Sequence, residues 1–171
     1  WLPFFPVLAA AIGMTLALSA WNWDHQLNHV YALSLPITRW EYTLQKLLAG
    51  ATLALIPALG LWLGAHVAVA SIELPAGLSA YPNELGVRFF VAIVLAYALL
   101  FAMAAGTVRT TVTVLGLALG FVFFGSILND VLAGYFDIFG RVHVVEIVMN
   151  WLVQAPGPFE VFTGSWSLID V

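Results

Sequence analysis

The stretch LLAGATLALIPALGLWLGAHVAVASI, from Leu47 to Ile72, decides the fold class. It contains no Asp, Glu, Lys or Arg, and only His66 and Pro57 interrupt its apolar and small residues. A bilayer core about 30 Å thick needs about 20 predominantly apolar residues in a helix. The stretch therefore predicts a membrane-spanning helix, which we expect Pro57 to kink because proline lacks the amide hydrogen of a helical bond.

The composition of the whole chain agrees with that stretch. Its 171 residues are 63% hydrophobic and 8% charged, against about 45–50% and about 25% in soluble domains. This excludes a soluble enzyme. Five Lys and Arg against nine Asp and Glu give a net charge of −4 without a basic cluster, which excludes nucleic acid as a partner. Cysteine is absent, so no disulfide or thiolate site is expected.

Uncharged runs of sufficient length occur four times, so we expect an all-α, polytopic membrane bundle. Ionisable residues fall at the edges of these runs, which places none near the membrane midplane. One transmembrane domain over residues 1–171 accounts for all four spans. Because the sequence opens on Trp1, we expect further segments before and after it. The predicted spans are Leu2–Ala20, Leu47–Ile72, Val87–Gly106 and Val112–Leu128, the last extending to Phe136 if it includes its polar edge.

Four alternating spans fix which connections share a side. The elbow Asn22–Lys46 and the turn Thr107–Thr111 fall on one side, and the loop Glu73–Gly86 and the tail after Asp130 on the other. Lys and Arg number three on the first side against two on the second. The positive-inside rule therefore places the elbow in the cytoplasm.

The elbow has the pattern of a structured segment. Its sequence is NWDHQLNHVYALSLPITRWEYTLQK, with apolar residues at helical spacing before Pro36. Thr38 and Glu41 then form an [ST]-x-x-[DE] capping box in front of the next helix. A helix, a proline turn and a newly capped helix are therefore expected in that order.

The stretch from Tyr31 to Ala49 resembles the cytoplasmic segment between the second and third membrane helices of type-2 ABC exporter permeases. The family pattern is a short coupling helix, Ser-Leu-Pro, a small or hydroxyl residue before Arg, an aromatic or Glu pair, and a Lys opening the next helix. The family often has Gly-Thr and Glu in the coupling helix, where this chain has Leu27, Asn28 and Val30. The matching residues are Ser34, Leu35, Pro36, Thr38, Arg39, Glu41, Tyr42 and Lys46.

The resemblance implies a permease subunit rather than an enzyme. Its four spans would be the second to fifth of six helices, and no catalytic, cofactor or metal residue is expected in the chain. ATP and Mg would be bound by separate ABC ATPase subunits, because Lys46 does not stand in a phosphate-binding G-x-x-x-x-G-K-[ST] loop.

The resemblance also implies partners and a location. A second permease copy or a homologous permease would complete the pathway, with accessory subunits possible, as a multi-pass protein of the bacterial cytoplasmic membrane. The substrate is not indicated by the residues. The expected ATPase-contact residues are Asp24, His25, Leu27, Asn28, Tyr31, Leu33, Leu35, Pro36, Arg39 and Glu41.

The tail carries an amphipathic pattern within an external segment over 138–171. From Ile138 to Gln154, polar residues recur at steps of three and four, and Ala155-Pro156-Gly157-Pro158 ends the pattern. Such a helix lies in the interface or dips into the leaflet. Two interpretations stay open: an external gate over the pathway, or an interfacial helix that covers the bundle.

Two functional alternatives rest on the elbow. His25 and His29 are four apart beside Asp24, so on a helix they share a face as metal ligands would. A metal site there would make the chain a polytopic membrane enzyme, although the Glu of H-E-x-x-H is missing and two exposed histidines beside a membrane are more often simply solvated. The other alternative is a membrane anchor that binds a cytoplasmic partner without transporting anything.

Small residues and a lone histidine predict packing contacts. Gly60-x-x-x-Gly64 and Gly116-x-x-x-Gly120 permit close helix approach. We expect both to pack inside the bundle, with a dimer contact as the alternative. His66, near the far end of its span, is expected to be a packing residue at the outer interface rather than a substrate ligand.

Overall fold

The computed structural model is mostly helical and forms two compact units, residues 1–106 with 165–171 and residues 107–164. Each unit is described by itself. The described residues are 4–27, 34, 36–75, 77–106, 109–110, 112–114, 116–117, 120, 124, 127, 150–154 and 156–170.

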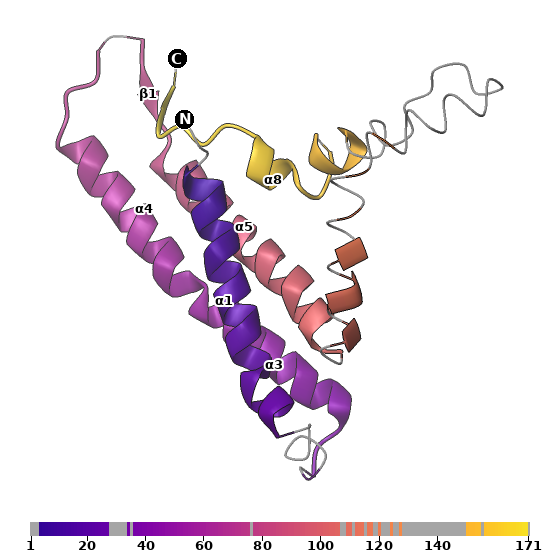
Figure 1. Ribbon diagram of the computed structural model, residues 1–171. Helices are drawn as coiled ribbons and strands as arrows, with labels where there is room; N and C mark the ends of the chain where they lie inside the picture. The colour runs from indigo at the N-terminus through magenta and orange to yellow at the C-terminus, as the bar shows by residue number, and fades with distance from the viewer. Residues whose placement is uncertain are drawn as a thin grey trace. The chain divides into compact units, whose positions relative to one another are not determined.

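The helices of unit one among the described residues are α1 (Phe4–Gln26), α3 (Arg39–Leu53), α4 (Leu55–Ala70) and α5 (Pro82–Ala104) (Figure 1). Among the described residues, three helical stretches are long and apolar enough to cross a membrane, with α3 and α4 counted as one. These stretches agree with the first three predicted spans, although α1 continues six residues beyond Ala20.

Helices α1 and α5 run parallel and meet along a seam of small residues. Ala9, Gly13 and Ala17 of α1 are buried at steps of four, as are Ala92 and Ala96 of α5. A Cβ atom built on Gly13 would lie 2.7 Å from the Ala96 Cβ and 2.8 Å from the Ile93 carbonyl oxygen. The two backbones therefore approach as closely as small residues allow, which is how helices associate within a bilayer.

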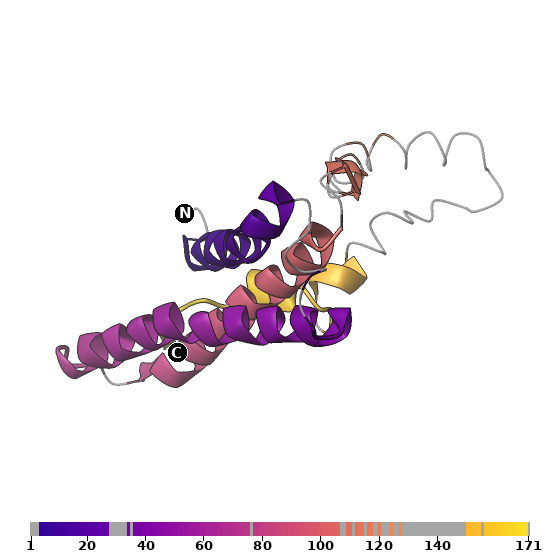
Figure 2. The ribbon, with the colours of Figure 1, turned by 90° about the horizontal axis from the view of Figure 1, so that it is seen from below.

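The second stretch is a helix interrupted at Ala54, where α3 ends and α4 begins. Pro57 has no amide hydrogen to donate to the Leu53 carbonyl, and its ring crowds that carbonyl. The interruption lies in the turn before Pro57, which confirms the expected effect of this proline. Figure 2 shows the two helices following one another end to end.

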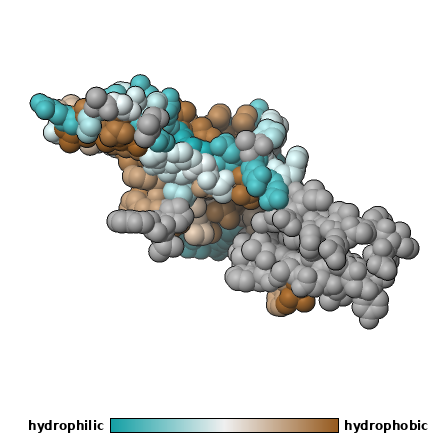
Figure 3. Space-filling view, turned by 90° about the horizontal axis from the view of Figure 1, so that it is seen from above, coloured by the Kyte–Doolittle hydropathy of each residue, from teal (hydrophilic) through white to brown (hydrophobic). Residues whose placement is uncertain are grey.

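The end of unit one opposite the elbow carries a short antiparallel strand pair. Strand β1 (Ser79–Ala80) pairs with β2 (Ile169–Asp170), with Ser79 opposite Asp170. The loop before α5 and the C-terminal segment therefore lie at the same end of the helices, as predicted. Figure 3 views this end, where hydrophilic and apolar surfaces adjoin.

A polar contact between α4 and α5 lies toward the same end. Asn83 Oδ1 accepts a hydrogen bond from Trp62 Nε1 at 2.8 Å and lies 3.1 Å from His66 Nε2. Gly86 makes room for the tryptophan, because a Cβ atom there would lie 2.7 Å from Trp62 Cδ1. His66 thus packs against Trp62 and contacts Asn83, in agreement with the packing expectation. That it does not bind substrate stays a prediction.

Unit two is described in part. Residues 109–110, 112–114, 116–117, 120, 124 and 127 are helical, while the rest of the fourth predicted span and 138–149 of the tail pattern lie outside the described residues. Helical residues 150–153 are followed by a turn over 156–159 and by α8 (Glu160–Thr163), which agrees with the predicted end of the tail helix. Phe159 N donates to the Leu152 carbonyl at 2.9 Å across this turn.

The prediction for the first glycine pair is wrong within the described residues, because nothing outside its own helix lies within 4 Å of a Cβ built on Gly60 or Gly64. Helix α4 instead packs through the face that holds Ala58 and Ala65, which turns Gly60 and Gly64 outward. Gly116 and Gly120 belong to unit two, and packing of this second pair inside the bundle stays a prediction. The dimer contact stays a prediction.

Substituting Gly13 by alanine should lower the free energy of unfolding by about 1–3 kcal/mol, because the added methyl group overpacks the seam between α1 and α5. Gly60→Ala is the matched control, since it adds the same methyl group to a helix but in open space. Unfolding in detergent micelles measures both. Equal stability of the two variants would contradict the close approach at Gly13.

Candidate functional site at the elbow between α1 and α3

A buried carboxylate joins the two limbs of the elbow. Asp24, in the last turn of α1, is 1% exposed and forms an ion pair with Lys46 of α3. The Tyr42 hydroxyl donates to Asp24 Oδ1 at 2.9 Å and lies 3.2 Å from Oδ2. Lys46 Nζ also donates to the Ala20 carbonyl at 2.6 Å. We call Asp24, Tyr42 and Lys46 the elbow cluster.

Helix periodicity explains why these residues meet. Tyr42 and Lys46 are four apart on α3, so they project from one face. On α1, Asp24 is three residues beyond Trp21, which also faces the interior. The Lys46 ammonium lies 4.7 Å from the centre of the Trp21 ring and 4.8 Å from that of Tyr42, a separation at which the faces of aromatic rings attract a cation.

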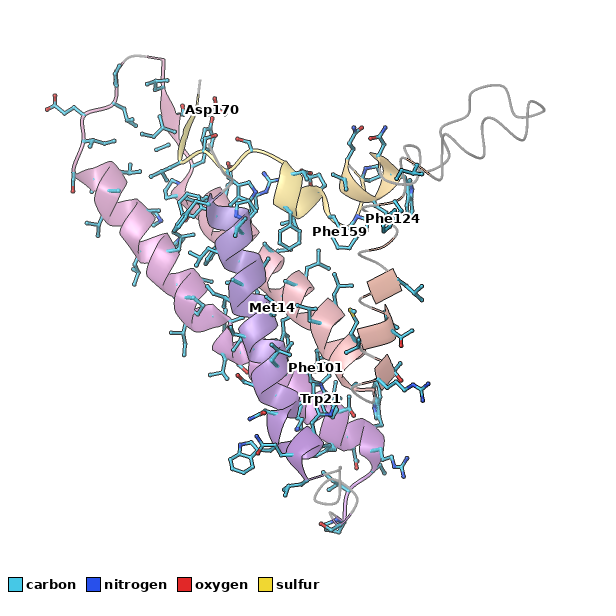
Figure 4. The ribbon with its side chains drawn as sticks, in the orientation of Figure 1. Met14, Trp21, Phe101, Phe124, Phe159 and Asp170 are labelled. Carbon is cyan, nitrogen blue, oxygen red and sulfur yellow. The ribbon has the colours of Figure 1, made fainter. Side chains whose placement is uncertain are left out.

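The elbow cluster is also connected to α5. The Tyr97 hydroxyl donates to the Lys46 carbonyl at 2.8 Å, and His25 Nε2 lies 3.0 Å from the Ala104 carbonyl. The ring centres of Trp21 and Phe101 are 5.1 Å apart. Figure 4 labels both residues near the lower end of α1. The end of α1, the start of α3 and the end of α5 therefore form one packed junction.

The energetics of this junction depend on complete pairing. Removing two charges from water is costly, and the cost is recovered only when each charge keeps its partners. Asp24 has Lys46 and Tyr42, and Lys46 has in addition a carbonyl oxygen and two ring faces. Such an arrangement fixes helix positions. It does not present a reactive group, because the carboxylate and the ammonium neutralise each other.

The start of α3 is fixed by the capping box that the sequence predicts. Thr38 Oγ1 accepts a hydrogen bond from Glu41 N at 3.2 Å, and Glu41 Oε2 accepts one from Thr38 N at 3.0 Å. The backbone N–H groups of Thr38 and Glu41 at the start of α3 are thereby both hydrogen-bonded. The second limb of the elbow therefore begins at a defined residue.

Apart from Asp24, the expected ATPase-contact residues fall into three groups. Leu27, Pro36, Arg39 and Glu41 are exposed around the elbow. His25 is half-buried against the Ala104 carbonyl. The residues that lie outside the described part of the chain are Asn28, Tyr31, Leu33 and Leu35, and with them the separate coupling helix.

Asp24 requires a correction. The expectation placed it on a helix that faces a partner, but α1 continues without interruption to Gln26 and carries Asp24 into the interior. The physical reason is the ammonium of Lys46, which lies where an uninterrupted α1 brings the carboxylate. Asp24 therefore supports the elbow from within and is not part of its exposed surface.

The histidine pair cannot be assembled from the described residues. His29 lies outside them, and His25 is directed toward the Ala104 carbonyl. Within the described residues, no group of three or more His, Asp or Glu side chains is placed to hold a metal ion.

Comparison with known proteins adds no relative. The chain matches no protein-family model, no curated protein and no solved structure.

Tyr42, Lys46 and Tyr97 of the junction are not among the expected ATPase-contact residues, although Tyr42 and Lys46 match the family pattern. Lys46 was assigned only to the start of the next helix, and Tyr97 was not singled out. The i, i+4 spacing of Tyr42 and Lys46 was a signal that could have linked Lys46 to an acidic partner on α1. Nothing in the sequence around Tyr97 distinguishes it from an ordinary residue of a membrane helix.

Asp24→Asn should lower the free energy of unfolding by about 3 kcal/mol, because it leaves the Lys46 ammonium without its counter-charge. This is the lower end of the range for a buried pair, since the Lys46 side chain is 20% exposed. Denaturant unfolding in micelles provides the measurement. Glu73→Gln, in an exposed loop, is the matched control and should change stability by less than about 0.5 kcal/mol.

The double variant Asp24→Leu/Lys46→Met distinguishes the effect of the ion pair from that of side-chain packing. Because it replaces both charged side chains by apolar ones of similar volume, it should recover most of the stability that Asp24→Asn loses. A double variant that is less stable than Asp24→Asn would show that the ion pair is not the origin of the loss.

Proposed function

We propose that the chain is a membrane-spanning permease subunit of an ABC exporter, and that its elbow receives the motion of a separate ATPase. The observation that carries the proposal is the buried Asp24–Lys46 ion pair, which fastens the two limbs of the elbow to each other. Together with the resemblance over Tyr31–Ala49, this ion pair supports an elbow whose two limbs keep their relative position when a partner binds to it.

The junction offers a route from the elbow into the membrane helices. A displacement of the start of α3 carries Lys46 with it, and Lys46 holds α1 through Asp24 and α5 through Tyr97. Buried polar contacts of this kind resist separation, since each parted group would be left unsatisfied. A force on the elbow therefore moves three helices together instead of one loop.

The exposed part of the elbow is suited to protein contact. Leu27 is 48% exposed and Trp40 is 70% exposed, and the exposed Arg39 precedes Trp40 in the sequence and adds a cation. Aromatic residues and arginine are enriched where protein surfaces bind each other. In this proposal the ATPase supplies the ATP-dependent movement, and the permease performs no covalent chemistry.

Purification of the full-length tagged protein in mild detergent tests the proposal. We expect mass spectrometry to identify a stoichiometric ATPase with a phosphate-binding loop. Arg39→Glu should reduce its recovery about tenfold, a loss of about 1.4 kcal/mol of binding free energy. Glu73→Lys reverses a charge at the opposite end of the helices and should leave recovery unchanged.

Each other outcome has a defined meaning. If the parent protein binds no ATPase, the exporter proposal is wrong. An ATPase that binds, but whose ATP hydrolysis is the same with and without the permease, would favour a membrane anchor. Loss of binding in both charge-reversal variants would show that the contact does not lie at the elbow.

A further inference from the structure

The residues Ser165–Asp170, which we call the clasp, attach to the ends of α1 and α5 opposite the elbow. Its last two residues form β2 and pair with β1. Tyr81 N donates to the Leu168 carbonyl at 2.9 Å, and the Arg88 guanidinium donates to the Ser165 carbonyl. The clasp is thus joined to the start of α5 by backbone hydrogen bonds and by one arginine.

Trp166 of the clasp lies between the two helices. Its ring is stacked on that of Phe5 of α1, with centres 6.3 Å apart and planes 16° apart. On α5, Phe89 meets it edge-on at 6.4 Å, and the Arg88 guanidinium lies 5.7 Å from its centre. These are favourable aromatic and cation–π geometries. One side chain of the clasp therefore contacts both helices.

The seam between α1 and α5 is built differently along its length. In the middle, Gly13 brings the backbones into direct contact. At the elbow end, Trp21 and Phe101 touch, and His25 lies against the Ala104 carbonyl. At the clasp end, Trp166 bridges Phe5 and Phe89, although it belongs to neither helix.

The attachment of the clasp is weak compared with the helices that it joins. Its ladder holds two residue pairs, and two-stranded ladders are marginally stable by themselves. Ser165, Ser167 and Asp170 are exposed. Segments with few buried contacts and exposed hydrogen bonds open at lower free energy than the core around them.

From these contacts we propose that the clasp holds the ends of α1 and α5 together reversibly. While it is seated, Trp166 ties the ends of α1 and α5 together; when it leaves, those ends separate and pivot about the contact at Gly13. This device goes beyond the proposed function, because it concerns the end opposite the elbow. It operates whether or not an ATPase drives it.

Spin labels on the full-length chain in lipid nanodiscs test the release. Because the chain has no cysteine, Val7→Cys and Val87→Cys place labels on α1 and α5 alone, at side chains that are 58% and 63% exposed. The parent should give one narrow distance distribution. Trp166→Ala should increase the population at longer distance about tenfold, as expected when two aromatic contacts are lost.

The controls keep the result specific. Trp151→Ala removes an exposed tryptophan of unit two and should reproduce the parent distribution. Trp166→Phe retains an aromatic ring and should give an intermediate population. Distributions that are identical in the parent, in Trp151→Ala and in Trp166→Ala would overturn the proposal.

A second measurement covers the case in which Trp166→Ala fails to fold. The pair Ala80→Cys/Ile169→Cys replaces register partners of the ladder, so oxidation should join them when the clasp is seated. Adding Trp166→Phe should slow this crosslinking several-fold. An unchanged crosslinking rate together with an unchanged distance distribution in Trp166→Phe would overturn the proposal. Because neither measurement involves ATP, its failure is distinguishable from failure of the exporter proposal.

Discussion

The close approach of α1 and α5 at Gly13 is the constraint on which the rest of unit one depends. Only a residue without a side chain leaves room there for the Ala96 methyl group and the Ile93 carbonyl. This contact sets where α1 ends relative to α5. It therefore sets how deeply Asp24 is carried into the interior.

The elbow cluster is the electrostatic counterpart of that packing. Small residues hold α1 to α5 by van der Waals contact, whereas Lys46 holds α1 to α3 by charge. Tyr97 connects the two systems, since it lies on the α5 seam and donates to the Lys46 carbonyl. Gly50 of α3 belongs to the same arrangement, because a Cβ atom there would overlap the Tyr97 ring. The ion pair and the close packing of α3 against Tyr97 therefore occur together at one end of the bundle.

Features that depend on residues close in the chain could be predicted from the sequence. Features that depend on contacts with another helix could not. The first three spans, the Thr38 cap and the effect of Pro57 follow from residues close in the chain, and the structure has them. The glycine pair at Gly60 failed because a small-residue pattern does not say which helix face finds a partner. The burial of Asp24 was missed for the same reason, since its counter-charge lies on another helix.

The parallel alignment of α1 and α5 has a consequence for the order of assembly. Their contacts join residues far apart in the chain; His25 and Ala104, for example, are 79 positions apart. Helix α1 is synthesised first and must keep its small-residue face against lipid until α5 has been inserted. The contact between α1 and α5 therefore has a high sequence separation and forms only after both helices have been made, which is the order in which helices associate within a bilayer.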